Sequence, residues 1–390
     1  MSVKVCGIGV VSSIGLGCGD NLQSLVSERS GIGPLTIFNT AINVPVGEVR
    51  FSNDELKEML GLNTGMTVSR TSLLGAIAVK EALNDADIDK SSSIGLISAT
   101  SVGGMDLSEN FYKQFMQNPG TGRLRDIAGH DCATSTDFIA GYCGIKGFRT
   151  TISTACSSAA NAVMFGAGLL EKGMLDYVVV GGVDALCRFT LNGFNSLMIL
   201  DKELCRPLDR DRKGLNLGEG AGYMVLTRDN ECKKVYCKLT GYANANDAFH
   251  QTASSDNGEG AFRAMSGALK MSGIAAGDID YINLHGTGTV NNDLSELTAV
   301  KRLFGEHIPR CSSTKCFTGH TLAAAGGIEA VYSVMAIENG LRFANLRFSN
   351  CMDGAGVTPV LKTETEVYIK NVLSNSFGFG GNCSSLIFTK

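Results

Sequence analysis

The 390-residue sequence predicts an α/β fold with largely parallel strands, built from two similar halves. Short runs that are almost continuously apolar, as buried strands are, alternate with longer helical segments. The same strand and helix pattern begins again after Arg228. Glycine reaches 48 residues without a collagen-like period, which predicts many tight turns and close backbone contacts.

Four runs in the first half are expected to be buried strands, namely 3–11, 94–102, 176–185 and 221–228. A helix is expected over 70–88, because apolar side chains recur there with helical spacing at Leu73, Leu74, Ile77, Ala78 and Leu83. The glycine-rich, polar region 103–149 shows little periodicity. It is therefore interpreted as an insertion, either a lid or an arm at a dimer contact.

A polar, charged stretch at 228–235 marks the expected junction between the halves. The predicted N-terminal half is 1–230 and the predicted C-terminal half is 231–390. The second half is expected to contain a strand at 235–247, a helix at 260–274 and a strand that runs into a loop at 278–289.

The two halves share one plan around a reactive side chain. In 150–173 and in 309–340, a polar strand end leads to a small-residue helix that ends in Glu-x-Gly. Aligning Cys156 with His320 superimposes "SSAANAV" on "TLAAAGG". A two-fold internal repeat would explain this, and it would aim both side chains from equivalent helix starts into one site.

Cys156, in "STACSSAANAV", has two interpretations. Free cysteines are often simply buried, so a packed cysteine is one possibility. A thiol at a helix start is the other, because the helix dipole and backbone N–H groups stabilise a thiolate and lower its pKa. The small residues that follow Cys156 would leave room for a substrate.

Two of the five histidines, His285 and His320, lie where strands end among glycine and threonine. Lys315 stands five residues before His320. Neutral imidazoles can donate hydrogen bonds to an oxyanion or transfer protons, whereas an isolated histidine is usually a packed polar residue. The spacing His307-x3-Cys311-x4-Cys316-x3-His320 fits no structural zinc pattern, so no metal site is predicted.

Composition excludes several classes of protein. Net charge is −4 and pI about 5.8, which does not suggest a nucleic-acid binder. The N-terminus reads as strand and turn rather than a signal peptide, and no apolar run is long enough for a membrane span. Thirteen cysteines without regular spacing predict reduced thiols and a cytoplasmic location.

Two loops complete the candidate site. The charged loop 206–226 leads into a glycine-rich strand, and its residues Arg206, Arg210, Arg212 and Lys213 are either a solvated surface loop or a basic patch that could meet an acidic partner. The segment 374–388 places two phenylalanines in a glycine loop between strands. Glycines there would let the loop swing as a gate, and its backbone N–H could donate to an oxyanion.

Together these segments resemble the β-ketoacyl synthases, the condensing enzymes of fatty acid and polyketide synthesis in the thiolase superfamily. The resemblance runs end to end, through "GIGVVSSIGLG", "TACSSA", "RPLDRDRKG…GEGAG", "HGTGTVNNDLSE", "STKCFTGH" with "AAAGGIEA", and "NSFGFGGN". It implies a thiolase fold, with two βαβαβαββ halves in a five-layered α-β-α-β-α sandwich, and usually a homodimer. It also implies acyl carrier protein as the partner and no metal or organic cofactor.

The resemblance implies a role for each matching residue. Cys156 would be the acyl-accepting nucleophile, and His285 and His320 would serve malonyl decarboxylation and condensation. Lys315 and Glu329 would be supporting charges, and Phe379 the gating residue whose N–H joins that of Cys156 in an oxyanion hole. The expected substrate-binding residues are Thr287 and Thr289 on the pantetheine arm, Val102 and Phe194 along the acyl chain, and Phe377.

Some positions depart from the family pattern. Lys213, Leu215 and Asn216 interrupt the usual D-x-x-R-D-G-F-V, and "GGNCSS" replaces "GGTNxS". Because of these changes, the product of a specialised pathway, such as a polyene or polyketide-like lipid, is a candidate as well as an ordinary fatty acid. Two alternatives remain: a thiolase-type enzyme that acts on CoA esters, and a partner subunit of a ketosynthase heterodimer.

Overall fold

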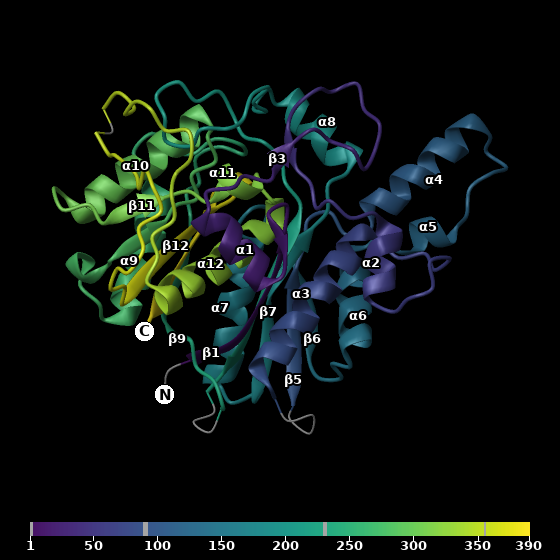
Figure 1. Cartoon of the computed structure of the whole chain (residues 1–390), viewed down its shortest axis with the longest axis horizontal. Coiled ribbons are helices and arrows are strands. Elements are labelled where there is room, and N and C mark those ends of the chain that lie inside the picture. The colour runs from purple at the N-terminus through teal and green to yellow at the C-terminus, as the bar shows by residue number, and fades with distance from the viewer. Residues whose placement is uncertain (1–2, 89–92, 229–231, 355) are drawn as a thin grey trace.

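The computed structural model describes residues 3–88, 93–228, 232–354 and 356–390 (Figure 1). An eleven-stranded sheet dominates it, and a separate two-stranded ladder pairs β3 (Ile32–Gly33) with β4 (Val46–Gly47). The predicted junction between residues 230 and 231 falls outside the described residues, so the division into 1–230 and 231–390 stays a prediction.

Both halves of the chain contribute strands to the large sheet, six from the first and five from the second. The first half supplies β1 (Val3–Ser12), β2 (Gly15–Leu16), β5 (Ile94–Ala99), β6 (Arg149–Ile152), β7 (Tyr177–Asp184) and β8 (Gly220–Thr227). The second half supplies β9 (Cys237–Asn246), β10 (Tyr281–Asn283), β11 (Arg310–Ser312), β12 (Asn371–Phe377) and β13 (Asn382–Thr389). The predicted strands are confirmed, although β10 and β5 are shorter than expected.

The two halves have the same topology. Spatial order is β6-β5-β7-β8-β1 in the first half and β11-β10-β12-β13-β9 in the second, so both follow the order third, second, fourth, fifth, first. In each half the two pairings at the outer edge of the sheet are parallel and the two nearer its centre are antiparallel. This confirms two pseudo-equivalent halves, which join where Val3–Val5 pairs with Cys237–Leu239.

Helices connect these strands. The first half contains α1 (Cys18–Val26), α2 (Asn53–Met59), α3 (Arg70–Ala86), α4 (Met105–Gln117), α5 (Arg125–Ala128), α6 (Cys132–Cys143), α7 (Ser158–Glu171) and α8 (Arg188–Ser196). The second contains α9 (Glu259–Ser272), α10 (Val290–Phe304), α11 (Lys315–Thr318) and α12 (Ala325–Asn339). Short 3-10 turns lie at η1 (Ala276–Asp278), η2 (Leu322–Ala324) and η3 (Phe379–Gly381).

The order of the layers is defined by the helices that pack between the two halves of the sheet. α7 and α12 pack on each other and form the middle layer, because α12 contacts β7 and β8 on one side and β12 on the other. α3 covers the outer face of the first half, and α9 covers that of the second (Figure 1). Close packing depends on glycine: a Cβ on Gly222 would stand 2.3 Å from the backbone nitrogen of Ile328. The result is the predicted five-layered sandwich.

The insertion at 103–149 holds α4, α5 and α6, more helix than its weak periodicity suggested. α4 buries none of its side chains and, with α5, projects from the body at the right of Figure 1. Tyr112 and Met116 are largely exposed on it. In the part of the chain that is described, no helix is both long and apolar enough to cross a membrane.

Candidate active site

Cys156 stands on a tight turn between β6 and α7. Ala155 takes the left-handed conformation, with φ of 53°, which lets the chain reverse just before the helix. Ser158 closes the turn, since its Oγ accepts from the Thr154 N–H at 2.7 Å and donates to the Ala155 carbonyl. The thiol is only 6% exposed and lines a cavity.

His320 reaches the same point from the second half. It follows α11, and its Nε2 lies 3.2 Å from Sγ of Cys156. The backbone of His320 is fixed on both sides, because its N–H donates to the Asn216 carbonyl at 2.7 Å and its carbonyl accepts from Gly218 at 2.9 Å. The Leu322 N–H donates to Nδ1 at 3.3 Å, so the ring proton of neutral His320 resides on Nε2, facing Cys156.

His285 lies directly after β10, with its ring centroid 5.4 Å from that of His320. Lys315 Nζ stands 3.3 Å from His285 Nδ1 and forms an ion pair with Glu329. An ammonium can only donate, so Nδ1 accepts and neutral His285 also carries its proton on Nε2. The two rings thus present N–H donors to one cavity, and Lys315 and Glu329 lie buried behind them.

Burial sets the protonation of these groups. Desolvation, with the nearby Lys315 charge, lowers the pKa of both His285 and His320 well below the ordinary value, so both rings are neutral at pH 7. Burial raises the pKa of Glu329 to about 7, and its Lys315 partner opposes that shift.

The predicted fall in the thiol pKa is wrong in direction. Burial raises the pKa of Cys156 to about 11, although Lys315 and the backbone N–H of Phe379 pull it down. A helix start does favour a thiolate, but complete removal from water costs the charged form more. The resting Cys156 side chain is therefore a neutral thiol at pH 7.

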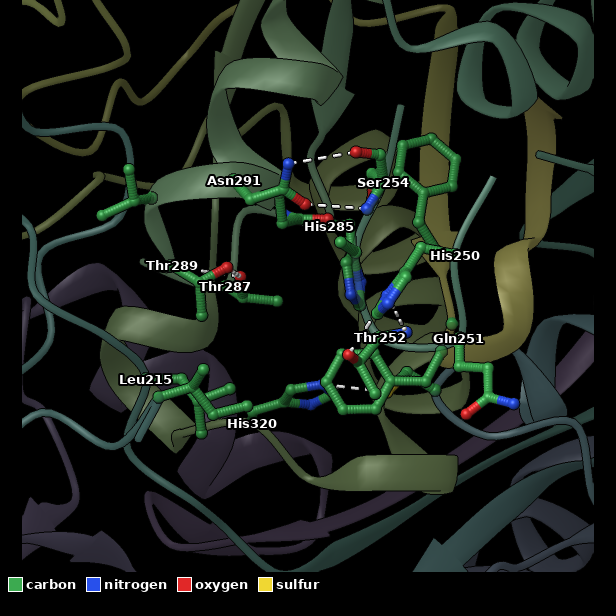
Figure 2. Close-up of a pocket in the computed structure, with 18 of the residues that line it drawn as sticks. Leu215, His250, Gln251, Thr252, Ser254, His285, Thr287, Thr289, Asn291 and His320 are labelled. Atoms are coloured by element: carbon green, nitrogen blue, oxygen red, sulfur yellow. Dashed lines mark hydrogen bonds between the residues drawn. The ribbon is translucent and has the colours of Figure 1, made fainter. Parts of the chain in front are cut away.

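The cavity that joins these groups has a volume of about 300 Å³. Figure 2 shows His285 and His320 directed into it, with Thr287 and Thr289 on one wall and His250 to Ser254 on the other. The threonine hydroxyls contact each other at 2.9 Å. Sequence analysis missed the opposite wall, including His250, Thr252, Ser254 and Asn291, since nothing in that polar loop signals a cavity.

Phe379 closes the cavity from the loop between β12 and β13. Its ring stacks on Phe194 of α8, with centroids 5.9 Å apart and planes 17° apart. Gly378 passes so close to the nucleophile turn that a Cβ there would stand 3.2 Å from the Cys156 nitrogen. Phe377, buried beside His285 at 5.9 Å between centroids, forms the inner wall. All three phenylalanines line the cavity, and their expected roles as gate and substrate contacts stay predictions.

Val102 does not line this cavity. It is buried in an apolar cluster with Leu186, Leu191 and Leu215, and Leu215 is the member that also lines the cavity. Its N–H donates at 3.0 Å to Asp184, the buried carboxylate at the end of β7. Val102 thus shares an apolar cluster with a cavity-lining residue, and its expected contact with an acyl chain stays a prediction.

Two buried carboxylates that the sequence did not single out hold the site together. Asp184 also accepts from the Ala323 N–H at 2.8 Å, which fixes the turn after His320. Glu296 accepts from the N–H groups of His285 at 2.9 Å and Gly286 at 2.8 Å. Burial raises the pKa of Glu296 to about 7. Asp184 ends a strand and Glu296 lies within α10, and a single acid at either place resembles a surface residue, so the sequence carried no clear signal for their burial.

The cluster has the spacing, but not the chemistry, of a metal site. Sγ of Cys156 and ring nitrogens of His285 and His320 lie within 4.8 Å of one another. Metal binding at Nε2 would move each ring proton to Nδ1, where Leu322 N–H and Lys315 already donate. The four residues of the His307, Cys311, Cys316 and His320 pattern form no such cluster among the described residues.

Comparison with known proteins agrees with this geometry. The profile of the β-ketoacyl synthase N-terminal domain matches residues 1–232, and that of the C-terminal domain matches 236–349. The 3-oxoacyl-[acyl-carrier-protein] synthase 2 of Rhizobium meliloti (strain 1021) is 32% identical, over 100% of this chain and 98% of its own.

Solved ketosynthases have the same fold over the whole chain. The ishigamide ketosynthase/chain length factor structure matches with a TM-score of 0.93 and 27% identity, covering 100% of this chain and 99% of its own. A ketosynthase in complex with its chain length factor, from Xenorhabdus doucetiae, matches with a TM-score of 0.86 and 31% identity, covering 100% and 98%. The chain therefore belongs to the β-ketoacyl synthase family of acyltransferases.

Proposed function

We propose that this protein condenses an acyl group with a malonyl thioester, both delivered by an acyl carrier protein, to give a β-ketoacyl thioester two carbons longer. The observation that carries the proposal is the contact between Cys156 Sγ and His320 Nε2 at 3.2 Å, with His285 beside it in one cavity. A nucleophile and two neutral N–H donors are what acyl transfer and enolate formation need.

In the first step the Cys156 sulfur attacks the acyl thioester carbonyl. The thioester C–S bond breaks, the acyl group stays on Cys156, and the thiol proton ends on the released carrier thiol. The oxyanion that forms on the way would accept from the backbone N–H groups of Cys156 and Phe379, both of which lie close to the sulfur. The Lys315 charge favours the transient thiolate.

In the second step a malonyl thioester enters the emptied cavity. The Nε2–H groups of His285 and His320 would donate to its thioester oxygen while the C–C bond to the carboxylate breaks and CO2 leaves. The resulting enolate carbon attacks the acyl carbon on Cys156, whose sulfur leaves as the new carbon–carbon bond forms. The Cys156 thiolate that leaves then takes up one proton to return to the neutral thiol, because CO2 carries none away. Neutral rings suit this role, since their N–H groups can hydrogen-bond the enolate oxygen without giving up a proton.

The partners follow from the same reading. The relative from Rhizobium meliloti is named for acyl carrier protein, and we propose that partner here. We also propose a dimer with a second copy through β6, the terminal strand of the sheet, where Phe148 and Phe165 stand exposed and in edge contact. A related subunit in place of the second copy would appear as a heterodimer in the mass of the natural complex.

We propose a cytoplasmic location, and the thirteen free cysteines support it. Two other functions fit less well. A thiolase-type enzyme would need a second cysteine as acid and base, but burial raises the pKa of Cys383 to about 12. A non-catalytic subunit would not need the complete set of Cys156, His285 and His320.

The test is trapping of the acyl group. Wild-type protein incubated with acyl-carrier protein should gain one acyl mass on Cys156, and Cys156→Ala should gain none and lose condensation by at least about 10³-fold. Cys351→Ala, at an exposed cysteine away from the cavity, is the control. Undiminished condensation by Cys156→Ala would overturn the proposal, and efficient cleavage of acetoacetyl-CoA by free CoA would favour the thiolase alternative.

A further inference from the structure

The cavity has one basic side chain on its wall that catalysis leaves unused. Among the described residues that line it, Lys213 is the one lysine or arginine. Lys213 is also one of the three positions where the charged loop departs from the family pattern. The other cation of that loop nearest in sequence, Arg212, is buried against Asp293 and cannot meet a ligand.

Lys213 is fixed beside the threonine wall. The neighbouring Gly214 carbonyl oxygen lies only 2.7 Å from where a Cβ on Gly288 would stand, between Thr287 and Thr289. Arg212 donates to the carbonyls of Thr289 at 3.2 Å and Val290 at 2.6 Å, which ties the two segments together. The position of Lys213 therefore depends on the same backbone that carries the threonines.

Exposure along this wall rises from the nucleophile outward. Cys156 is 6% exposed and Thr287 5%, whereas the Lys213 side chain is 62% exposed. A carrier-bound thioester has its sulfur at one end of an extended arm, amides along it and a phosphodiester at the far end. Sulfur at Cys156 and amides at the threonines would leave the phosphodiester at the exposed end, on the side of Lys213.

Asn216, a second position that departs from the family pattern, helps to position Lys213 through Glu203. Lys213 Nζ lies 3.4 Å from Glu203, which also accepts from Arg206 at 2.9 Å. The buried Asn216 side chain donates to the Glu203 carbonyl at 3.0 Å and accepts from the Cys205 N–H at 2.7 Å. Asn216 thus holds the segment that presents Glu203, and Glu203 holds Lys213 at the entrance until an anion replaces it.

We propose that Lys213 binds the phosphodiester of a carrier-bound phosphopantetheine arm and so selects carrier-delivered thioesters over thioesters without phosphate. This rests on the proposed acyl transfer to Cys156. Glu203 is the resting partner that the phosphodiester displaces, and Asn216 is a positioning residue for Glu203.

The experiment measures kcat/KM for acylation of Cys156 by three donors with the same acyl group: acyl-carrier protein, acyl-phosphopantetheine and acyl-pantetheine. Lys213→Met should lower the first two values about fivefold, the worth of one half-exposed charge-assisted hydrogen bond, and leave the third within about twofold. Lys213→Arg should recover most of the loss. Lys202→Met, the same charge change at an exposed lysine off the cavity wall, should not discriminate between phosphorylated and unphosphorylated donors.

The outcomes separate this inference from the function on which it rests. If wild-type protein is acylated by none of the three donors, the proposed function fails. If it is acylated but Lys213→Met slows all three equally, Lys213 shapes the cavity and the phosphodiester role is wrong. A loss confined to acyl-carrier protein would assign Lys213 to the carrier surface and likewise overturn the proposal.

Discussion

The two halves share one strand order yet fill equivalent connections with different chemistry. The link from β6 to α7 carries Cys156 alone, on a turn of a few residues. The equivalent link from β11 to α12 is longer, because α11 and η2 are inserted, and it carries Lys315 and His320. The halves are thus alike in backbone plan and unlike in charge.

The return connections show the same division. Between β7 and β8 lies a long excursion with α8, Phe194 and Lys213, whereas β12 and β13 are joined by the short loop of Phe379. The two meet in the stacked pair of phenylalanines. The comparison teaches that the internal repeat supplies two converging helix starts, and that specialisation lies in the connections: a nucleophile from one half, proton donors and a gate from the other.

The largest expected effect on stability comes from breaking a buried ion pair, and each half offers one for comparison: Arg70–Glu219 in the first and Lys315–Glu329 in the second. Lys315→Met leaves Glu329 buried without a partner, so the free energy of unfolding should fall by about 3 kcal/mol. Arg70→Met, which leaves Glu219 in the first half with only the N–H groups of Val49 and Leu186 as donors, should cost a similar amount and is the matched control. Urea unfolding measures both.

Activity then distinguishes the pairs. Lys315 lowers the pKa of both catalytic histidines, so Lys315→Met should move the acid limb of the condensation rate toward higher pH. Folded Arg70→Met should keep the wild-type limb. Equal pH profiles in the two variants would contradict the conclusion that Lys315, in the second half, sets the pKa of the two histidines.

The pH dependence of stability gives the next effect. A histidine whose folded pKa is lowered adds stability that is complete above its unfolded value near 6.5 and is lost as pH falls below it. His320→Asn should therefore reduce the slope of unfolding free energy against pH by about 0.7 kcal/mol per pH unit at pH 6.5, rising toward about 1.4 kcal/mol per pH unit near pH 5.5. An unchanged slope would mean that His320 is protonated in the folded site. His307→Asn, which changes an exposed histidine, is the control.

A smaller effect concerns the stack of Phe194 on Phe379, where the β7–β8 connection meets the β12–β13 loop. Phe194→Ala removes the stack on Phe379 and should speed alkylation of Cys156 by iodoacetamide about fivefold, because the gate is held less firmly. Phe189→Ala, at an exposed phenylalanine of the same helix, should leave the rate near wild type. Slower alkylation in Phe194→Ala would show that the stack does not hold the gate.

The smallest effect concerns a polar bond across the halves. Asn382, at the start of β13, accepts from Ser157 Oγ at 2.6 Å and Asn161 Nδ2 at 2.8 Å on the α7 side. Asn382→Ala should cost about 1 kcal/mol in the free energy of unfolding, since its donors are partly open to water. Asn382→Asp, which keeps the acceptor, should cost less. Equal losses would assign the effect to packing.

The sequence predicted what depends on periodicity and repetition. The apolar runs located the principal strands, and the alignment of Cys156 with His320 anticipated side chains that the structure places 3.2 Å apart. How deeply a residue is buried could not be predicted from the sequence. The pKa of the Cys156 thiol rises rather than falls because the side chain is buried. Val102 and Asp184 depend on long-range packing, which no local pattern encodes. The functional roles of the site residues stay predictions for the experiments above.

The shared middle layer has a consequence for the order in which the chain is made. A ribosome completes β7 and β8 about a hundred residues before α12. Until residue 339 emerges, Gly182 and Gly222 have no α12 to pack against, so their sheet face remains open. We expect the nascent first half to stay incomplete and to finish folding only when its late-synthesised counterpart docks, which makes the repeat a single cooperative unit rather than two independent ones.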